Sequence, residues 1–108
     1  MTDKILVHST CSSKDEAERL ARALVESRLA ACVAITPGVT SFYRWQGAIE
    51  QSEEWSLAIK TSRGLFPALR TELARLHSYQ VPEILAVPVL DGSEAYLAWM
   101  DAELQAAP

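Results

Sequence analysis

Residues 39–60 read VTSFYRWQGAIEQSEEWSLAIK, and this stretch decides the fold. Tyr43 and Trp45 share one face of its first half, as the two-residue period of a β-strand requires. Apolar residues alternate with polar or small ones in the same way from Trp55 onward. Gly47 accepts the positive φ that a tight turn between two strands needs. We therefore expect a long antiparallel hairpin.

A strand, a helix and a second strand are expected on the N-terminal side of this hairpin. Ile5 to His8 is a short apolar run of the kind found in buried strands. Ser13-Lys14-Asp15-Glu16 has the S-x-x-E pattern that starts many helices, and an apolar face at helical spacing follows it. Ala31 to Ile35 is predicted as the second strand, and Val39 to Trp45 as a further extended segment.

The C-terminal side of the hairpin predicts a helix, a strand and a final helix. Leucines recur every three or four positions from Leu65 to Leu76, with Pro67 tolerated in the first turn. Ile84 to Val89 is predicted as a buried strand, and Asp91-Gly92-Ser93 as the start of the last helix. This α+β order, βαββαβ plus α, indicates one ferredoxin-like domain over residues 1–108. Its antiparallel sheet is expected in the order 4-1-3-2, with two helices on one face.

Composition and charge exclude several classes of protein. Apolar residues make up 49% of the chain, and the formal charge is −4 with Lys and Arg scattered, so neither nucleic acid nor an anionic membrane surface is an expected partner. Two cysteines are too few for a disulfide framework, which favours reduced thiols. No apolar run approaches the roughly 18 residues that would span a bilayer, so we expect a cytoplasmic protein. The sequence contains no P-loop, H-E-x-x-H or G-x-S-x-G motif, and we do not expect an enzyme.

Three residues with metal-binding side chains are expected at one rim of the sheet. Strand directions bring Cys11, at the end of the first strand, to the edge where His77 and Glu83 lie. Cys11 precedes a helix N-terminus that favours a thiolate, although a loop thiol without a role is the alternative. His77 is alternatively a cation at a helix end, and Glu83 a solvated carboxylate. Cys32 lies at the opposite rim and is expected in the core.

The aromatic residues predict self-association. They are concentrated on the hairpin and the final helix: Phe42, Tyr43, Trp45, Trp55, Tyr96 and Trp99. Both faces of the hairpin carry rings, and a monomer with helices on one sheet face cannot bury them all. A Trp side chain that buries ~200 Å² contributes about 4 kcal/mol, which an assembly would recover. We therefore expect an oligomer.

Several stretches resemble the CutA divalent-cation tolerance family over nearly the whole chain, from Ile5 to Leu104. They are Leu29 to Val33, Ser41 to Gly47, Lys60-Thr61, His77 to Glu83 and Tyr96 to Trp99. The resemblance implies a ferredoxin-like homotrimer whose hairpins wrap around a three-fold axis, with a link to copper and other divalent ions. The residues that it places in an inter-subunit cleft are Tyr43, Trp45, Lys60, His77, Tyr79, Glu83 and Trp99.

Two functional hypotheses follow from the resemblance and the residues together. The first is a trimeric protein of the response to metal ions, which binds Cu(II) or another divalent cation weakly through Cys11, His77 and Glu83. The alternative is a signalling or scaffold trimer whose clefts bind a small anionic metabolite or a partner protein, with Lys60 and Arg44 as the positive contacts. The chain departs from the family at two loop prolines, which are replaced here by Lys14 and Ser78.

Overall fold

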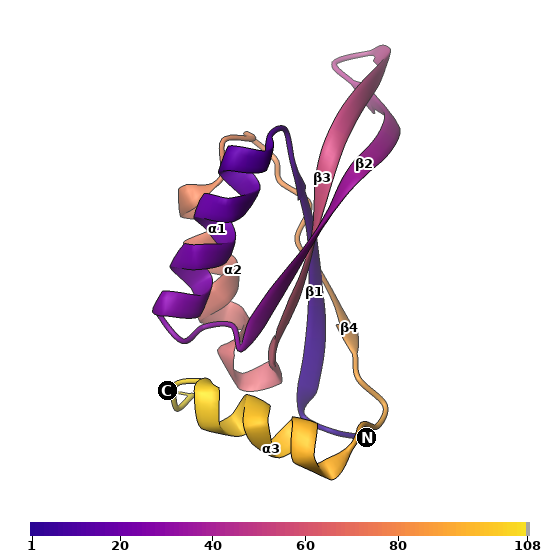
Figure 1. Ribbon diagram of the computed structural model, residues 1–108. Helices are drawn as coiled ribbons and strands as arrows, with labels where there is room; N and C mark the ends of the chain where they lie inside the picture. The colour runs from indigo at the N-terminus through magenta and orange to yellow at the C-terminus, as the bar shows by residue number, and fades with distance from the viewer. Residues whose placement is uncertain (108) are drawn as a thin grey trace.

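The computed structural model describes residues 1–107, which form one antiparallel sheet with helices beside it (Figure 1). The elements follow one another as β1 (Lys4–Cys11), α1 (Lys14–Glu26), β2 (Cys32–Trp45), β3 (Ala48–Ser62), a short 3-10 turn (Arg63–Leu65), α2 (Phe66–Leu76), β4 (Leu85–Pro88) and α3 (Glu94–Glu103). The predicted order of strands and helices is confirmed.

The sheet has the strand order β2-β3-β1-β4, which is the expected 4-1-3-2 order. Helices α1 and α2 lie side by side on one face, and β2 and β3 continue well past them as a two-stranded hairpin (Figure 1). Gln46 and Gly47 at its tip have φ values of 51° and 84°, as the central residues of a tight hairpin turn require. The hairpin therefore presents both faces outside the core.

Strand β2 contains a β-bulge where it passes from the core into the hairpin. Thr36 pairs with Ser56 and Val39 pairs with Glu54, so two residues of β2 stand opposite one residue of β3. Gly38 takes a φ of 76°, a conformation that glycine adopts without strain. The bulge joins what the sequence predicts as two separate extended segments into one strand.

The core lies between the helices and the sheet, and alternation along the strands fills it. Val7 from β1 and Leu57 and Ile59 from β3 have no exposed surface. They pack with buried leucines of both helices, Leu20, Leu24, Leu69 and Leu73. Helix α1 begins as predicted, because the Ser13 hydroxyl accepts a hydrogen bond from the Glu16 N–H at 3.1 Å.

The two cysteines lie in the reverse of their predicted environments. Strand β1 continues to Cys11, so the alternation of Val7 and Ser9 points its side chain into the core, where it is 0% exposed. Cys32 is half-buried. It pairs with Lys60 of the neighbouring strand, and both side chains lie on the face of the sheet that points away from the core. The predictions of a loop position for Cys11 and a core position for Cys32 are both wrong. The thiols are free, as expected.

Single replacements of the two cysteines with serine are therefore expected to differ in their effect on the free energy of unfolding. Cys11→Ser should lower the free energy of unfolding by about 1–3 kcal/mol, because it places a hydroxyl in an apolar core. Cys32→Ser should change it by less than about 1 kcal/mol, since that site is partly open to water. Urea unfolding at one fixed chain concentration measures both, and a larger loss in Cys32→Ser would contradict the assignment.

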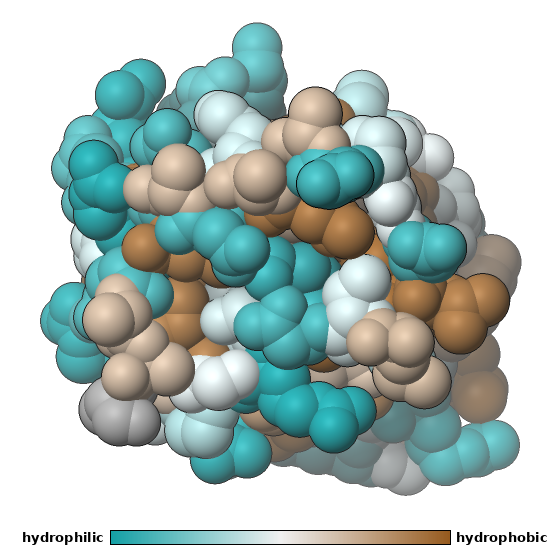
Figure 2. All heavy atoms as spheres, turned by 90° about the horizontal axis from the view of Figure 1, so that it is seen from below, coloured by the Kyte–Doolittle hydropathy of each residue, from teal (hydrophilic) through white to brown (hydrophobic). Residues whose placement is uncertain are grey.

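Strand β4 differs from its prediction, because it is exposed and not buried. It forms an edge of the sheet beside β1, and Leu85 and Val87 are 61% and 42% exposed. Helices α1 and α2 lie together on one face of the sheet (Figure 1). Seen from below, apolar side chains reach the surface in several places, including the margin on the side of β4 (Figure 2).

Helix α3 crosses the lower end of the sheet, close to the N-terminus (Figure 1). Its residue Met100 is buried, and Asp101 forms an ion pair of 2.7 Å with the buried Lys4 of β1. Arg28, after α1, donates hydrogen bonds to the backbone carbonyls at the end of α3. No helix within residues 1–107 has the length and apolar character needed to span a bilayer.

Candidate functional site

An open cavity of about 700 Å³ lies where the base of the hairpin meets the loop after α2. The end of β1, the hairpin strands and the loop of residues 78–83 all contribute to its lining. The lining residues are Thr10, Ser41, Phe42, Tyr43, Trp45, Glu54, Ser78, Tyr79, Gln80, Val81 and Glu83. This volume is typical of a small-molecule site.

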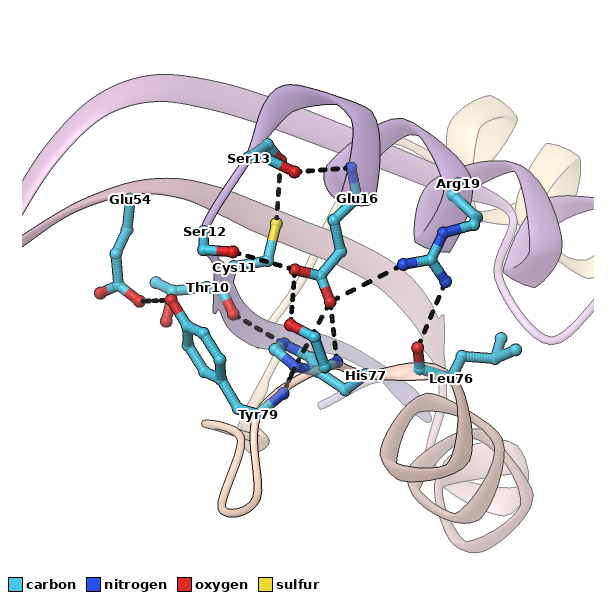
Figure 3. Close-up of polar contacts among 11 residues, drawn as sticks. Thr10, Cys11, Ser12, Ser13, Glu16, Arg19, Glu54, Leu76, His77 and Tyr79 are labelled. Atoms are coloured by element: carbon cyan, nitrogen blue, oxygen red, sulfur yellow. Dashed lines mark hydrogen bonds and ion pairs between the residues drawn. The ribbon is translucent and has the colours of Figure 1, made fainter.

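The ring of His77 anchors the loop to the end of β1 (Figure 3). Its Nδ1 accepts a hydrogen bond from the Tyr79 N–H at 3.0 Å, so the proton of the neutral ring lies on Nε2. Nε2 donates that proton to the Thr10 carbonyl at 2.8 Å. The side chain has no exposed surface. Both ring nitrogens are therefore engaged by the backbone, which positions the loop beside the cavity.

A buried carboxylate, Glu16 of α1, holds the same loop from the other side (Figure 3). It accepts hydrogen bonds from the N–H of Ser78 at 2.8 Å and from its hydroxyl at 2.9 Å. Burial raises the pKa of Glu16, but the two hydrogen bonds from Ser78 outweigh it and hold the pKa below its usual value. A proline at position 78 would have no N–H to donate, so this departure from the family supplies a loop contact.

The thiol of Cys11 is placed below the rim and not on it. Its Sγ donates to the Ser13 carbonyl at 3.5 Å, and burial raises the pKa of the thiol. The expected activation to a thiolate by the helix N-terminus is therefore wrong. Among the described residues 1–107, no three His, Cys, Asp or Glu side chains are placed to hold a metal ion together. Cys11, His77 and Glu83 share the rim region without forming a ready ligand set.

The inner wall of the cavity carries a buried carboxylate, that of Glu54 on β3. The Tyr79 hydroxyl donates to its Oε2 at 2.7 Å, and Glu54 is only 6% exposed. Burial and the neighbouring Glu54 carboxylate raise the pKa of Tyr79, so the phenol stays a donor at neutral pH. The other carboxylate oxygen points away from Tyr79 (Figure 3). A negative charge is thus held at the base of the hairpin.

The residues predicted for an inter-subunit cleft divide into two groups. Tyr43, Trp45, Tyr79 and Glu83 all line the cavity, and His77 positions its loop. Lys60 and Trp99 lie elsewhere, near the other end of the sheet. The Lys60 ammonium donates to the Tyr96 hydroxyl at 3.1 Å, and the Tyr96 and Trp99 rings are 5.3 Å apart.

Sequence reasoning missed Glu54 and Glu16 as functional residues. Glu54 lies in the returning strand on the face of Lys60, a position typical of a solvated charge, and only Tyr79, far along the chain, makes it a buried acceptor. Glu16 is the acidic residue of the S-x-x-E helix start, and in the fold its side chain turns to Ser78. Sequence carried a signal only for Glu16, the acidic residue of the S-x-x-E pattern.

The long hairpin, the sheet order and the cavity at the hairpin base define a small α+β protein with a binding site at one end of its sheet. The chain belongs to the CutA1 divalent ion tolerance protein family, whose model matches residues 5–103.

Individual relatives agree with this membership. Over 100 residues the chain is 46% identical to the divalent-cation tolerance protein CutA of Thermus thermophilus, covering 93% of this chain and 95% of that protein. It is 45% identical to the human protein CutA over 91 residues, which cover 84% of this chain and about half (51%) of the human protein. A crystal structure of CutA from Xylella fastidiosa matches with a TM-score of 0.93 and 45% identity, covering 96% of this chain and 100% of that one.

Proposed function

We propose that this chain forms a cytoplasmic homotrimer that binds divalent metal ions weakly, Cu(II) among them, and acts in the response to metal ions. Family membership supports the link to divalent ions, because relatives such as the Thermus thermophilus protein are named divalent-cation tolerance proteins. The side-chain types of His77, Cys11 and Glu83 support copper, since imidazole, thiolate and carboxylate suit borderline metals and Cu(II) heads the affinity order of divalent ions.

The observation that carries the metal proposal is the position of His77. Its Nε2 lies 2.8 Å from the carbonyl of Thr10, the residue before Cys11, and Glu83 lines the cavity into which Thr10 also faces. Binding requires the imidazole to exchange a backbone hydrogen bond for the metal and the Cys11 thiol to lose its proton. Both steps cost free energy, so the proposed affinity is low and falls as the pH is lowered.

Exposed apolar surface supports the trimer. Phe42 and Ile49 on the hairpin are 67% and 62% exposed, and Leu85 on β4 is 61% exposed. Large apolar side chains exposed on the hairpin and on the edge strand β4 favour aggregation of a monomer, and pairing with neighbours in a closed ring covers them. In the trimer each hairpin packs against the neighbouring sheet.

Copper titration of two histidine variants tests the metal proposal. Wild type should release or absorb heat on addition of Cu(II), and His77→Ala should bind at least about tenfold more weakly, because it loses the imidazole ligand. The matched control is His8→Ala, which removes the only other histidine of the sequence. Isothermal calorimetry at pH 7 measures both, with thermal melting to establish that each variant is folded.

The same titration has outcomes that contradict the proposal. Equal copper affinity in wild type and His77→Ala would remove His77 as a ligand, and a loss only in His8→Ala would move the site to the open face of the sheet. Either outcome would favour the alternative function, a trimer that binds a small anion. Lys60 supports that alternative, because its hydrogen bond with Tyr96 raises the pKa of its ammonium group and keeps the charge in place.

A further inference from the structure

Aromatic rings form part of the cavity at the hairpin base. Tyr43, Trp45 and Tyr79 contribute to the lining, and Tyr43 and Trp45 share one face of the hairpin. Tyr43 is 42% exposed, so part of its ring is open to a ligand. The face of an aromatic ring carries partial negative charge and attracts a cation within about 6 Å of its centre. Rings from two different parts of the chain thus surround the same space.

The charged groups of the lining are all negative. Glu54 and Glu83 both face the cavity, and no Lys or Arg of residues 1–107 is among the lining residues. Glu54 is buried and has one oxygen occupied by Tyr79, while its other oxygen points away from that ring (Figure 3). A buried carboxylate without a positive partner is costly, and a bound cation would offset that cost.

The aromatic rings and the two carboxylates of the lining together favour one class of ligand over the others. An anion would meet two carboxylates and no positive charge, which is unfavourable. A metal ion would find only two carboxylates, and no group of three suitable side chains exists among the described residues. A neutral ligand would leave the Glu54 charge uncompensated. A positively charged organic group gains from both the carboxylates and the rings.

We propose that the cavity lined by Tyr43, Trp45, Glu54 and Tyr79 binds a small organic ammonium ion. The ammonium group lies against the Tyr43 ring with its charge toward Glu54. The Tyr43 hydroxyl is 2.7 Å from that of Ser52, which is two residues before Glu54 on the same face of β3. The alkyl part of the ligand fills the outer cavity beside Val81. Tyr79 fixes the Glu54 carboxylate through its hydroxyl. This site shares Glu83 with the metal site proposed above, but it requires no bound metal.

Choline chloride is the probe that tests the site. It is titrated into the protein as it assembles in solution, in buffer with a chelator, and binding is followed by isothermal calorimetry and tryptophan fluorescence. Saturable binding is expected. The neutral compound 3,3-dimethylbutan-1-ol has the shape of choline without its charge, and it should bind at least about tenfold more weakly. Equal binding of the two compounds would overturn the proposal.

Two neighbouring glutamates of β3 provide a matched pair of variants. Glu54→Gln keeps the size of the side chain and an acceptor for Tyr79 but removes the charge, so choline affinity should fall at least about fivefold. Glu53→Gln makes the same change on the opposite face of the strand, where Glu53 accepts a hydrogen bond from Thr40. Its affinity should change less than about twofold. Equal losses in the two variants would contradict a specific site.

A third variant keeps the test decisive if Glu54→Gln does not fold. Tyr43→Leu retains an apolar side chain at a partly exposed position but removes the aromatic face, and its choline affinity should fall at least about threefold. Wild-type affinity in Tyr43→Leu, or no saturable choline binding in wild type, would overturn the proposal. Because the chelator removes divalent ions, this outcome is independent of the copper titration.

Discussion

Replacing Glu16 with alanine is expected to lower the free energy of unfolding by about 2–4 kcal/mol at pH 7. The carboxylate is 5% exposed and accepts two hydrogen bonds from Ser78, so its removal takes the acceptor from a backbone N–H and a hydroxyl and leaves a gap where the buried side chain was. The loop of residues 77–83 would loosen with it. Urea unfolding at one fixed chain concentration measures the loss, and hydrogen exchange at Ser78 and Tyr79 should rise.

The pH dependence supplies a second signature of Glu16. Its pKa in the folded protein lies below the ordinary value of 4.5, so its contribution is complete above pH 4.5 and is lost as the pH falls through the folded pKa. The Glu16→Ala variant should therefore approach wild type in stability under acid conditions. Glu18→Ala, an exposed site on the same helix, is the control and should change stability by less than about 0.5 kcal/mol. Equal losses in both variants would contradict the buried network.

Light scattering is expected to give wild-type protein a mass of about three times the 11.9 kDa chain. Trp45→Ala should shift this mass toward the monomer or lower the melting temperature by several degrees. The reason is that a large ring of the hairpin, 37% exposed in the single chain, contributes contact area between subunits. Measurements over a range of concentrations separate dissociation from unfolding.

Gln51→Ala is the matched control for the hairpin. Gln51 is exposed and pairs across the hairpin with Phe42, but it carries no large apolar surface. Its mass and melting temperature should equal those of wild type. A wild-type mass of one chain at micromolar concentration would contradict the assembly, and equal effects of Trp45→Ala and Gln51→Ala would remove Trp45 from the contact.

The order of elements could be predicted because local patterns determine it. Alternation over residues 39–60 and the S-x-x-E start of α1 each report a local preference that the tertiary structure keeps. The ends of strands were less well predicted, and the cysteines show the reason. Ser9 and Thr10 read as the end of β1, but pairing with β3 extends the strand to Cys11 and carries the alternation inward. Such pairing is non-local and leaves no mark in a short window.

In the candidate site, too, the sequence predicts the general position of the residues but not their individual contacts. The rim that brings Cys11, His77 and Glu83 to one region follows from strand direction alone. Which atoms are free cannot be predicted that way, because the His77 ring is occupied by the backbone of Thr10 and Tyr79. Glu54 depends on Tyr79 in the same manner. Side-chain partners distant in the chain decide whether a polar residue is a ligand or a support.

One inserted residue in β2 determines which side chains the hairpin offers to the cavity. Two residues of β2 stand opposite one of β3 at the bulge, so Thr36 and Val39 face the same side although an odd number of positions separates them. A chain shorter by Gly38 would reverse every later side chain of the strand. Phe42 and Arg44 would then occupy the face of Tyr43 and Trp45, placing a guanidinium opposite Glu50 on the face that carries Glu54. The sign of the charge that this cavity accepts thus depends on whether the residue count between core and hairpin is odd or even.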